Sequence, residues 1–290
     1  MSIANEGHSN WITVTCLLVR SASEAVKRTG GVNLTQFRIL VYLSHHEDCN
    51  VKQVSDVLGL NPSTVSLAIS NLEGIGACLR NYPDADRRIV LMRITPKGTD
   101  ILNAVDPVIE DLAHEFWSVY DDAELAMTKR DSAATASLFG RTYIKDGSAS
   151  VETAYVDAGI VILAKLERQM KRANISLNEY RILYLLSENP RGMRPSDIGR
   201  SLFLRSSETT QAIDKLVKHA RVQRTRDAAD RRSNIVSITT AGYDKLKKTT
   251  PHVVDMLKSD ICPLEQDSFA RYDSIAAKVV QQQQRQYLMR

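Results

Sequence analysis

The chain has 290 residues, of which 43% are hydrophobic and 25% charged, and this is ordinary for a globular protein of about two domains. Its formal net charge of +4 is too small by itself to argue for a nucleic-acid partner. The apolar stretches are short and broken by charge, which excludes a transmembrane helix, and the first residues do not follow the pattern of a signal peptide. We expect a cytoplasmic protein whose scattered cysteines are reduced thiols: Cys16, Cys49, Cys78 and Cys262.

The first half of the chain predicts four helices, a hairpin and two further helices. Apolar residues recur at helical spacing over 11–28, 34–45, 51–58 and 62–73. Asn61 suits the N-cap of the fourth helix, and Pro62 suits its first turn, where no N–H is needed. Two short strands are expected at 79–82 and 89–94, around a charged turn. Thr95 and Pro96 then begin a long helix to about residue 120, and a last helix is expected over 123–143.

The second half of the chain repeats the first. Three runs match in the same order: Leu34–Leu40 (LTQFRIL) with Leu177–Leu183 (LNEYRIL), Asp86-Arg87-Arg88 with Asp230-Arg231-Arg232, and Ile94–Gly98 (ITPKG) with Ile238–Gly242 (ITTAG). Three collinear matches make chance a poor explanation. The sequence therefore predicts two homologous domains, residues 1–146 and 147–290, joined at the turn-like segment Lys145–Ser150.

The order of elements predicts the fold class. In the second copy we expect helices over 151–173, 177–188, 195–202, 206–219, 240–259 and 264–288, with strands near 222–226 and 234–238. Three helices, a hairpin and a long helix make a winged helix-turn-helix. The chain should be mainly α with small β-wings, as tandem winged helix-turn-helix domains. The long flanking helices of the two copies should bury one another in a helical pseudo-dimer interface.

Each copy resembles a MarR-type regulator. In the first copy the resemblance lies in Leu58–Ser66 (LGLNPSTVS) with Leu72-Glu73, then in Asp86-Arg87-Arg88 and Ile94–Gly98; in the second it lies in Leu202–Thr210 with Leu216, then in Asp230-Arg231-Arg232 and Ile238–Gly242. The resemblance covers nearly the whole chain, and its most specific part is the DRR run followed by the I-T-x-x-G helix start. It implies a regulator of transcription, most often a repressor, that binds double-stranded DNA. Members of this family are usually homodimers of single domains, so the fusion implies a monomer that acts as a pseudo-dimer, although two chains could still associate.

The DNA-binding residues are expected on two recognition helices and two wings. The outward helix positions are Ser63, Thr64, Ser66, Leu67, Ser70 and Asn71 in the first copy and Ser207, Glu208, Thr210, Gln211, Asp214 and Lys215 in the second. The wing positions are Arg80, Asp86, Arg87 and Arg88 in the first copy and Arg224, Arg226, Asp230, Arg231 and Arg232 in the second. By resemblance, Arg88 and Arg232 match the family's wing arginine. The alternatives are a solvated helix face and a structural Asp–Arg pair in a tight turn.

The two copies differ on the outward helix face. Thr64 stands where the second copy has Glu208, Leu67 where it has Gln211, and Asn71 where it has Lys215. The first recognition helix also lacks the Arg or Lys that is common in the family, so the first copy depends on its wing for positive charge. A homodimer has to read a palindrome, and a fused pair is free of that constraint. We therefore expect an asymmetric or imperfectly palindromic operator.

The resemblance also implies a small aromatic or phenolic effector, held near the flanking helices. The candidate pocket residues are Trp11, Arg20, Tyr42, His46, Tyr155, Lys165 and Tyr184. For each of them a place in the core or on the surface is the commoner role. Cys16 in the first helix is a weak candidate for redox sensing, because a reactive thiol needs an electropositive, accessible setting. The run His45–Cys49 is rich in metal ligands, but adjacent side chains diverge, and we expect neither a metal nor a cofactor.

Two other function classes remain to be weighed. A winged-helix protein that has lost DNA binding could act as a protein-interaction module; the uncharged first recognition helix supports this alternative, and the wing arginines oppose it. An enzyme is not expected, because the sequence has no P-loop, GxGxxG, GxSxG, HExxH or paired-carboxylate motif.

Overall fold

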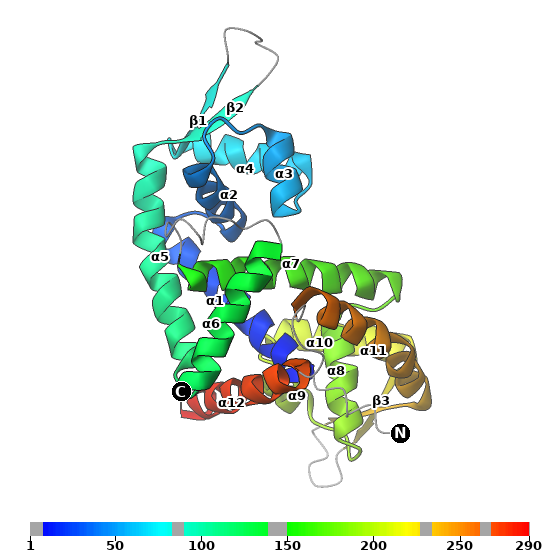
Figure 1. Cartoon of the computed structure of the whole chain (residues 1–290). Helices are drawn as coiled ribbons and strands as arrows, with labels where there is room; N and C mark the ends of the chain where they lie inside the picture. Colours follow the sequence, from blue (N-terminus) through cyan, green and yellow to red (C-terminus); the bar gives the residue numbers. More distant parts are fainter. Residues whose placement is uncertain (1–7, 83–89, 139–149, 227–233, 262–267, 290) are drawn as a thin grey trace. The chain divides into compact units, whose positions relative to one another are not determined.

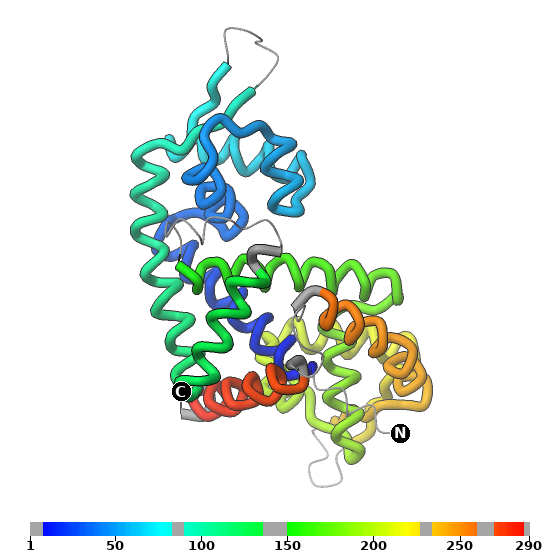
Figure 2. The backbone as a smooth tube through the Cα atoms, in the orientation of Figure 1, coloured from blue at the N-terminus to red at the C-terminus, as the bar shows by residue number. Residues whose placement is uncertain are grey.

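The computed structural model describes residues 8–82, 90–138, 150–226, 234–261 and 268–289, which are drawn as coloured ribbon in Figure 1, and Figure 2 follows the backbone in the same orientation. These residues are mainly helical and form two small antiparallel hairpins, which confirms the predicted fold class. Over these ranges, no helix combines the length and the apolar character that a membrane crossing requires. The described residues divide into two compact units that do not coincide with the two sequence repeats.

The first compact unit spans Leu18–Val161 and is called here the first-repeat unit. It begins within α1 (Ser9–Gly30) and ends within α7 (Val151–Arg172). Between them lie α2 (Leu34–His45), α3 (Val51–Leu58), α4 (Pro62–Gly74), β1 (Cys78–Asn81), β2 (Leu91–Ile94), α5 (Pro96–Trp117) and α6 (Asp122–Leu138). The β1–β2 hairpin projects beyond the helices α2–α4, as the wing of a winged helix does (Figure 1).

The second compact unit consists of Met1–Leu17 and Ile162–Arg290 and is called the second-repeat unit. Its winged helix contains α8 (Leu177–Glu188), α9 (Pro195–Ser201), α10 (Ser206–Lys218), β3 (Val222–Arg226) and β4 (Asn234–Ile238). The helices α11 (Thr240–Ile261) and α12 (Ser268–Met289) follow (Figure 1). In both units a single bridge adds a short third segment to the hairpin, between Cys49 and Met92 and between Met193 and Val236.

Local capping chemistry explains where several of these helices begin. Asn33 and Asn50 each accept a hydrogen bond from a backbone N–H three residues later, at 2.9 Å. The glutamines at those positions, Gln36 and Gln53, return a side-chain bond to the N-cap N–H and complete a capping box. Asn61 is the N-cap residue of α4 and Pro62 its first residue, as the sequence predicts, but the Asn61 side chain makes no capping hydrogen bond. At the other end of α3, Gly59 adopts the left-handed conformation that ends the helix.

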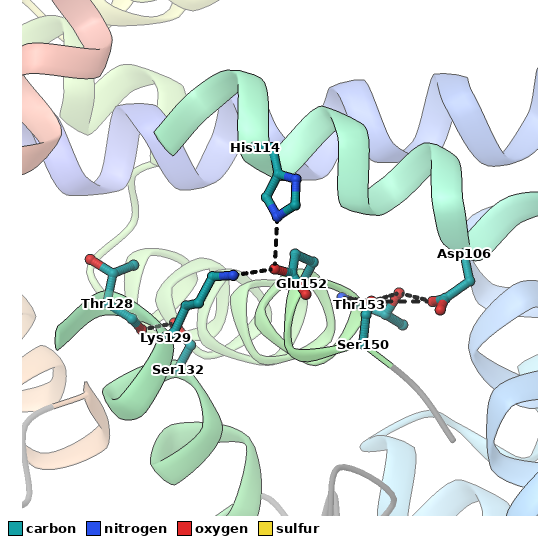
Figure 3. Close-up of polar contacts among 8 residues, drawn as sticks. All are labelled: Asp106, His114, Thr128, Lys129, Ser132, Ser150, Glu152 and Thr153. Carbon is teal, nitrogen blue, oxygen red and sulfur yellow. Dashed lines mark hydrogen bonds and ion pairs between the residues drawn. The ribbon is translucent and has the colours of Figure 1, made fainter. Parts of the chain in front are cut away.

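The start of α7 is anchored inside the first-repeat unit (Figure 3). The buried carboxylate of Glu152 lies 3.2 Å from Nε2 of His114 on α5 and 3.2 Å from Nζ of Lys129 on α6. The hydroxyls of Ser150 and Thr153, which flank Glu152 in the sequence, donate to the Asp106 carboxylate of α5. The N-terminal segment of α7 therefore belongs to the core of a unit whose other elements all come from the first repeat.

The second-repeat unit holds the start of α1 in a similar way. The backbone N–H of Trp11 donates to Oδ1 of Asp273 on α12 at 3.0 Å, and the Asn10 amide donates to the other carboxylate oxygen at 2.9 Å. The buried His8 ring lies 2.6 Å from the Tyr180 hydroxyl, which in turn contacts the Thr250 hydroxyl at 3.2 Å. Each unit is thus completed by the first part of a helix that continues into the other unit.

Candidate nucleic-acid interface

The recognition helices α4 and α10 have inner faces of the same pattern. Val65, Ala68, Ile69 and Leu72 are buried on α4, and Thr209, Ala212, Ile213 and Leu216 are buried on α10. Both helices pack against the preceding short helix and against the second helix of their own repeat, α2 or α8. This packing fixes which side of each helix faces outward.

The outward positions expected to contact DNA lie on the opposite face. On α4 these residues are exposed except for Ser66, and on α10 they are exposed except for Glu208; these two are half-buried. Leu67 stands out because 65% of its surface is exposed, which is the largest value for a bulky apolar side chain in the described ranges. The outward face of α4 is therefore composed of small polar groups around one exposed leucine.

In each wing, an arginine of the first strand contacts the recognition helix of the same repeat. Arg80 of β1 donates to the Ser70 hydroxyl at 2.8 Å and forms an ion pair of 3.0 Å with Glu73. At the equivalent place in the second repeat, Arg224 of β3 donates to the Asp214 carboxylate at 2.6 Å. Both arginines were predicted to belong to the wings. Their contacts hold the base of each wing against the recognition helix of the same repeat.

The wing strands of the two repeats carry further arginines in different settings. In the first wing, Arg93 forms a charge-assisted pair with Asp48, and this contact holds the pKa of the Asp48 carboxyl below its usual range. In the second wing, Arg226 is exposed at the end of β3. The other residues predicted for the wings lie outside the described residues: Asp86, Arg87, Arg88, Asp230, Arg231 and Arg232.

The I-T-x-x-G motif joins each wing to the long helix that follows. The Thr95 hydroxyl accepts from the Gly98 N–H at 3.2 Å, and so caps α5, and it donates to the Gly76 carbonyl at 2.7 Å. Thr239 makes the same two contacts, with Gly242 and with the Ala220 carbonyl. The motif glycine is required because a Cβ at Gly98 would stand 2.2 Å from the Ala77 carbonyl oxygen. The pattern recognised in the sequence therefore fixes the junction between the wing and the long helix.

A buried arginine supports the helix-turn-helix of each repeat. Arg38 of α2 donates from Nη2 to the carbonyl of Leu58, the last residue of α3, at 3.2 Å, and from Nε to the Asp157 carboxylate. Arg181 of α8 donates to the Leu202 carbonyl at 2.7 Å and reaches the Thr13 hydroxyl at 3.4 Å. No role of these arginines was predicted from the sequence. The signal was present, because an arginine occupies the same place in both matched runs, LTQFRIL and LNEYRIL.

The candidate effector residues are distributed over both units. Trp11, Lys165 and Tyr184 belong to the second-repeat unit, where Tyr184 is buried against His8 with ring centroids 4.8 Å apart. Arg20, Tyr42, His46 and Tyr155 belong to the first-repeat unit, where burial raises the pKa of Tyr155 to about 12. A small pocket in that unit has different lining residues, among them Phe37, Arg38 and Asp157, and has room for about one water molecule. An aromatic effector stays a prediction.

The ligand-rich run His45–Cys49 has structural contacts. The His46 ring stacks on Tyr42 with a centroid distance of 4.3 Å, Asp48 pairs with Arg93, and the Cys49 thiol contacts the His46 carbonyl. Within the described ranges, no group of three His, Cys, Asp or Glu side chains is placed to hold a metal ion. These contacts explain why a run of potential ligands occurs here.

The buried cysteines are expected to react slowly with thiol reagents. Burial raises the pKa of Cys78 from 9.0 to about 11, and burial also raises the pKa of Cys49. At pH 8 the Cys78 thiolate should be about a hundredfold less populated than that of an unperturbed thiol, and only the thiolate attacks. Site-resolved mass spectrometry after iodoacetamide labelling measures this rate. The denatured protein is the control, and equal Cys78 labelling of the folded and denatured protein would contradict the expectation.

Comparisons with known proteins agree with the geometry. The sequence pattern of the MarR family matches residues 32–90, and a second pattern of the same family matches residues 173–233. The HTH-type transcriptional regulator MhqR of Bacillus subtilis is 30% identical over 97 residues, which is 33% of this chain and 67% of that protein. The transcriptional repressor MprA of Escherichia coli K12 is 29% identical over 96 residues, which is 32% of this chain and 54% of that protein.

Two solved structures resemble part of the chain. A MarR family transcriptional regulator from Streptomyces coelicolor, in complex with DNA, is 24% identical, with a TM-score of 0.40 over 44% of this chain and 82% of that one. CouR from Rhodococcus jostii RHA1, bound to p-coumaroyl-CoA, is 16% identical, with a TM-score of 0.41 over 45% of this chain and 92% of that one. The matches of sequence pattern and of the Bacillus regulator carry the assignment. With one match in each repeat, the chain belongs to the MarR family of DNA-binding transcription regulators and has two MarR domains in one polypeptide.

Proposed function

We propose that the chain is a sequence-specific repressor that binds one double-stranded operator as a single-chain pseudo-dimer, and that the two half-sites of this operator differ in sequence. One observation carries the proposal. The recognition helices α4 and α10 share the pattern of their buried faces, but their exposed faces differ at nearly every position. Two recognition helices that pack in the same way but present different side chains suit two half-sites of different sequence.

The distribution of charge supports the same proposal. Between Pro62 and Gly74 the first recognition helix has no Lys or Arg, whereas α10 has Lys215 exposed on its outward face. Phosphate contacts by Lys and Arg provide most of the affinity for DNA, and base-edge contacts provide most of the sequence preference. We therefore infer that the first half-site depends more on its wing for affinity than the second does.

The test is a salt titration of binding to DNA from the region upstream of the gene. The wild type is compared with the wing variant Arg88→Ala/Arg232→Ala. Each lost phosphate contact should reduce the slope of log K against log salt by about 0.9, so the double variant should lose about 2 in slope and bind more weakly. The matched control is Arg28→Ala/Arg168→Ala, which removes the same charge from exposed helix positions outside both winged helices. The control should retain the wild-type slope.

Two further readouts separate the parts of the proposal. Selection from random DNA should return an operator that is not a perfect palindrome, and one chain should bind per operator by light scattering. A perfect palindrome would contradict the unlike half-sites, and two chains on each operator would contradict the single-chain pseudo-dimer. A folded protein with no sequence preference even at low salt would remove the repressor function and favour the protein-interaction module.

A further inference from the structure

Leu67 and Gln211 occupy the same position on the two recognition helices. Each directly precedes a buried Ala-Ile pair, Ala68-Ile69 on α4 and Ala212-Ile213 on α10. Both side chains are exposed on the outward face of the helix. Because the buried pair fixes the rotation of each helix, the two side chains leave the backbone at matching places in their own winged helix. The repeats therefore present an aliphatic group and an amide group at one equivalent point.

Two acidic neighbours of Gln211 on α10 already form hydrogen bonds within the protein. The Glu208 carboxylate accepts from the Arg205 backbone N–H at 2.8 Å, and the Asp214 carboxylate accepts from Arg224 at 2.6 Å. Gln211 lies between these two acidic residues on the exposed face. Its amide can donate and accept at the same time, which is the combination that matches the N6 and N7 edge of adenine.

The corresponding part of the first repeat offers an apolar contact. Ser70 accepts from Arg80, and Glu73 pairs with the same arginine, so both groups are committed to the base of the wing. Leu67 is 65% exposed among small side chains such as Ser63 and Ser66. A single exposed leucine is common on protein surfaces, but this one lies on the face that the proposed function directs into the major groove. The group in that groove that fits an aliphatic side chain is the 5-methyl group of thymine.

We propose that Leu67 reads a thymine methyl group in the half-site bound by the first repeat, and that Gln211 reads an adenine at the matching place in the other half-site. This inference rests on the proposed DNA binding by both winged helices. It assigns the difference between the half-sites to one pair of equivalent residues, of which one recognises an apolar group and the other a hydrogen-bonding edge.

The experiment changes single atoms or groups of the operator obtained by selection. Each thymine is replaced in turn by deoxyuridine, which removes only the 5-methyl group, and each adenine by 7-deazadeoxyadenosine, which removes the N7 acceptor. Dissociation constants are measured by fluorescence anisotropy at one salt concentration, for the wild type, Leu67→Ala and Gln211→Ala. Both side chains are exposed, so neither substitution removes a core contact.

We expect one thymine in one half-site at which deoxyuridine weakens wild-type binding by about fourfold, which is the ratio for one methyl group removed from an apolar contact. Leu67→Ala should bring this ratio to about one, and Gln211→Ala should leave it unchanged. The converse should hold for one adenine in the other half-site. The exchange variant Leu67→Gln should prefer adenine over thymine at the position that it contacts.

Three outcomes would overturn the inference. If every thymine tolerates deoxyuridine, or if Leu67→Ala retains the wild-type ratio, Leu67 does not read a methyl group, although sequence-specific binding stands. If Gln211→Ala retains the 7-deazaadenine effect, the assignment of Gln211 fails in the same way. If the wild type shows no sequence preference at all, no operator is recovered, and the inference fails together with the proposed function.

Discussion

Replacing Asp157 by alanine is expected to lower the free energy of unfolding of the first-repeat unit by about 3–5 kcal/mol. Asp157 and Arg38 form an ion pair in which both side chains are 6% exposed. Removing the carboxylate leaves a guanidinium buried with one carbonyl contact, at Leu58. An uncompensated buried charge costs far more than the net gain from the intact pair, so the loss should be much larger than for an exposed ion pair.

The two tryptophans of the chain allow the units to be followed separately. Trp117 belongs to the first-repeat unit and Trp11 to the second-repeat unit, and both are buried. Urea unfolding of Asp157→Ala, followed by fluorescence in a Trp11→Phe background, reports the unit that contains Asp157. The same substitution in a Trp117→Phe background should shift the remaining transition less.

The second repeat provides the matched control. Thr13 takes the place of Asp157 beside Arg181, which the Leu202 carbonyl and the Asn178 side chain also hold. Thr13→Ala should therefore cost about 1 kcal/mol, as for the loss of one ordinary hydrogen bond. The apolar replacement Arg38→Met/Asp157→Leu should recover much of the stability lost in Asp157→Ala. Equal effects of Asp157→Ala and Thr13→Ala would contradict the assigned importance of the ion pair.

Replacing Gly98 by alanine is expected to cost at least about 1–3 kcal/mol and to displace the first wing. The new Cβ would lie 2.2 Å from the Ala77 carbonyl oxygen and 2.6 Å from a side-chain carbon of Ile94. The oxygen belongs to the backbone immediately before β1, so the clash cannot be relieved by rotating a side chain. The start of α5 and the base of the hairpin would have to move apart.

Gly74→Ala is the control for this substitution. Gly74 is the last residue of α4, and a Cβ there would meet nothing within 4 Å. Alanine should be neutral at this position or should raise stability by up to about 1 kcal/mol, because glycine weakens helices. Urea unfolding compares the two variants, and the salt slope of DNA binding reports displacement of the wing. The steric argument fails if Gly98→Ala is as stable as Gly74→Ala.

Much of the local structure could be predicted from the sequence. Helices α2, α3 and α8 and the strands β3 and β4 have the predicted bounds, because capping residues and changes of hydrophobic period mark their ends. Other ends differ by a few residues; α5, for example, ends at Trp117 and not at about residue 120. The repeated I-T-x-x-G run was expected to begin a helix in each copy, and the contacts of Thr95 and Gly98 explain this pattern in the first copy.

The interactions between distant segments could not be predicted in the same way. Periodicity identifies a buried face, but not the element that covers it, so nothing local linked Arg38 to Asp157 or Asn10 to Asp273. The sequence repeats predict two continuous homologous domains, 1–146 and 147–290. The compact units are defined by packing, and their boundaries lie within α1 and α7. The boundaries of the repeats remain a prediction about homology, and the compact units describe packing.

The shared helices have a consequence for synthesis of the protein. When the ribosome has completed the first winged helix, the part of α7 that supplies Glu152 and Asp157 to its core has not yet been made. The start of α1 meets its partner even later in synthesis, because Asp273 lies 263 residues after Asn10. Contacts of such long sequence separation form late and leave apolar surface uncovered in the meantime. Neither unit can therefore complete its core until translation has passed these later segments.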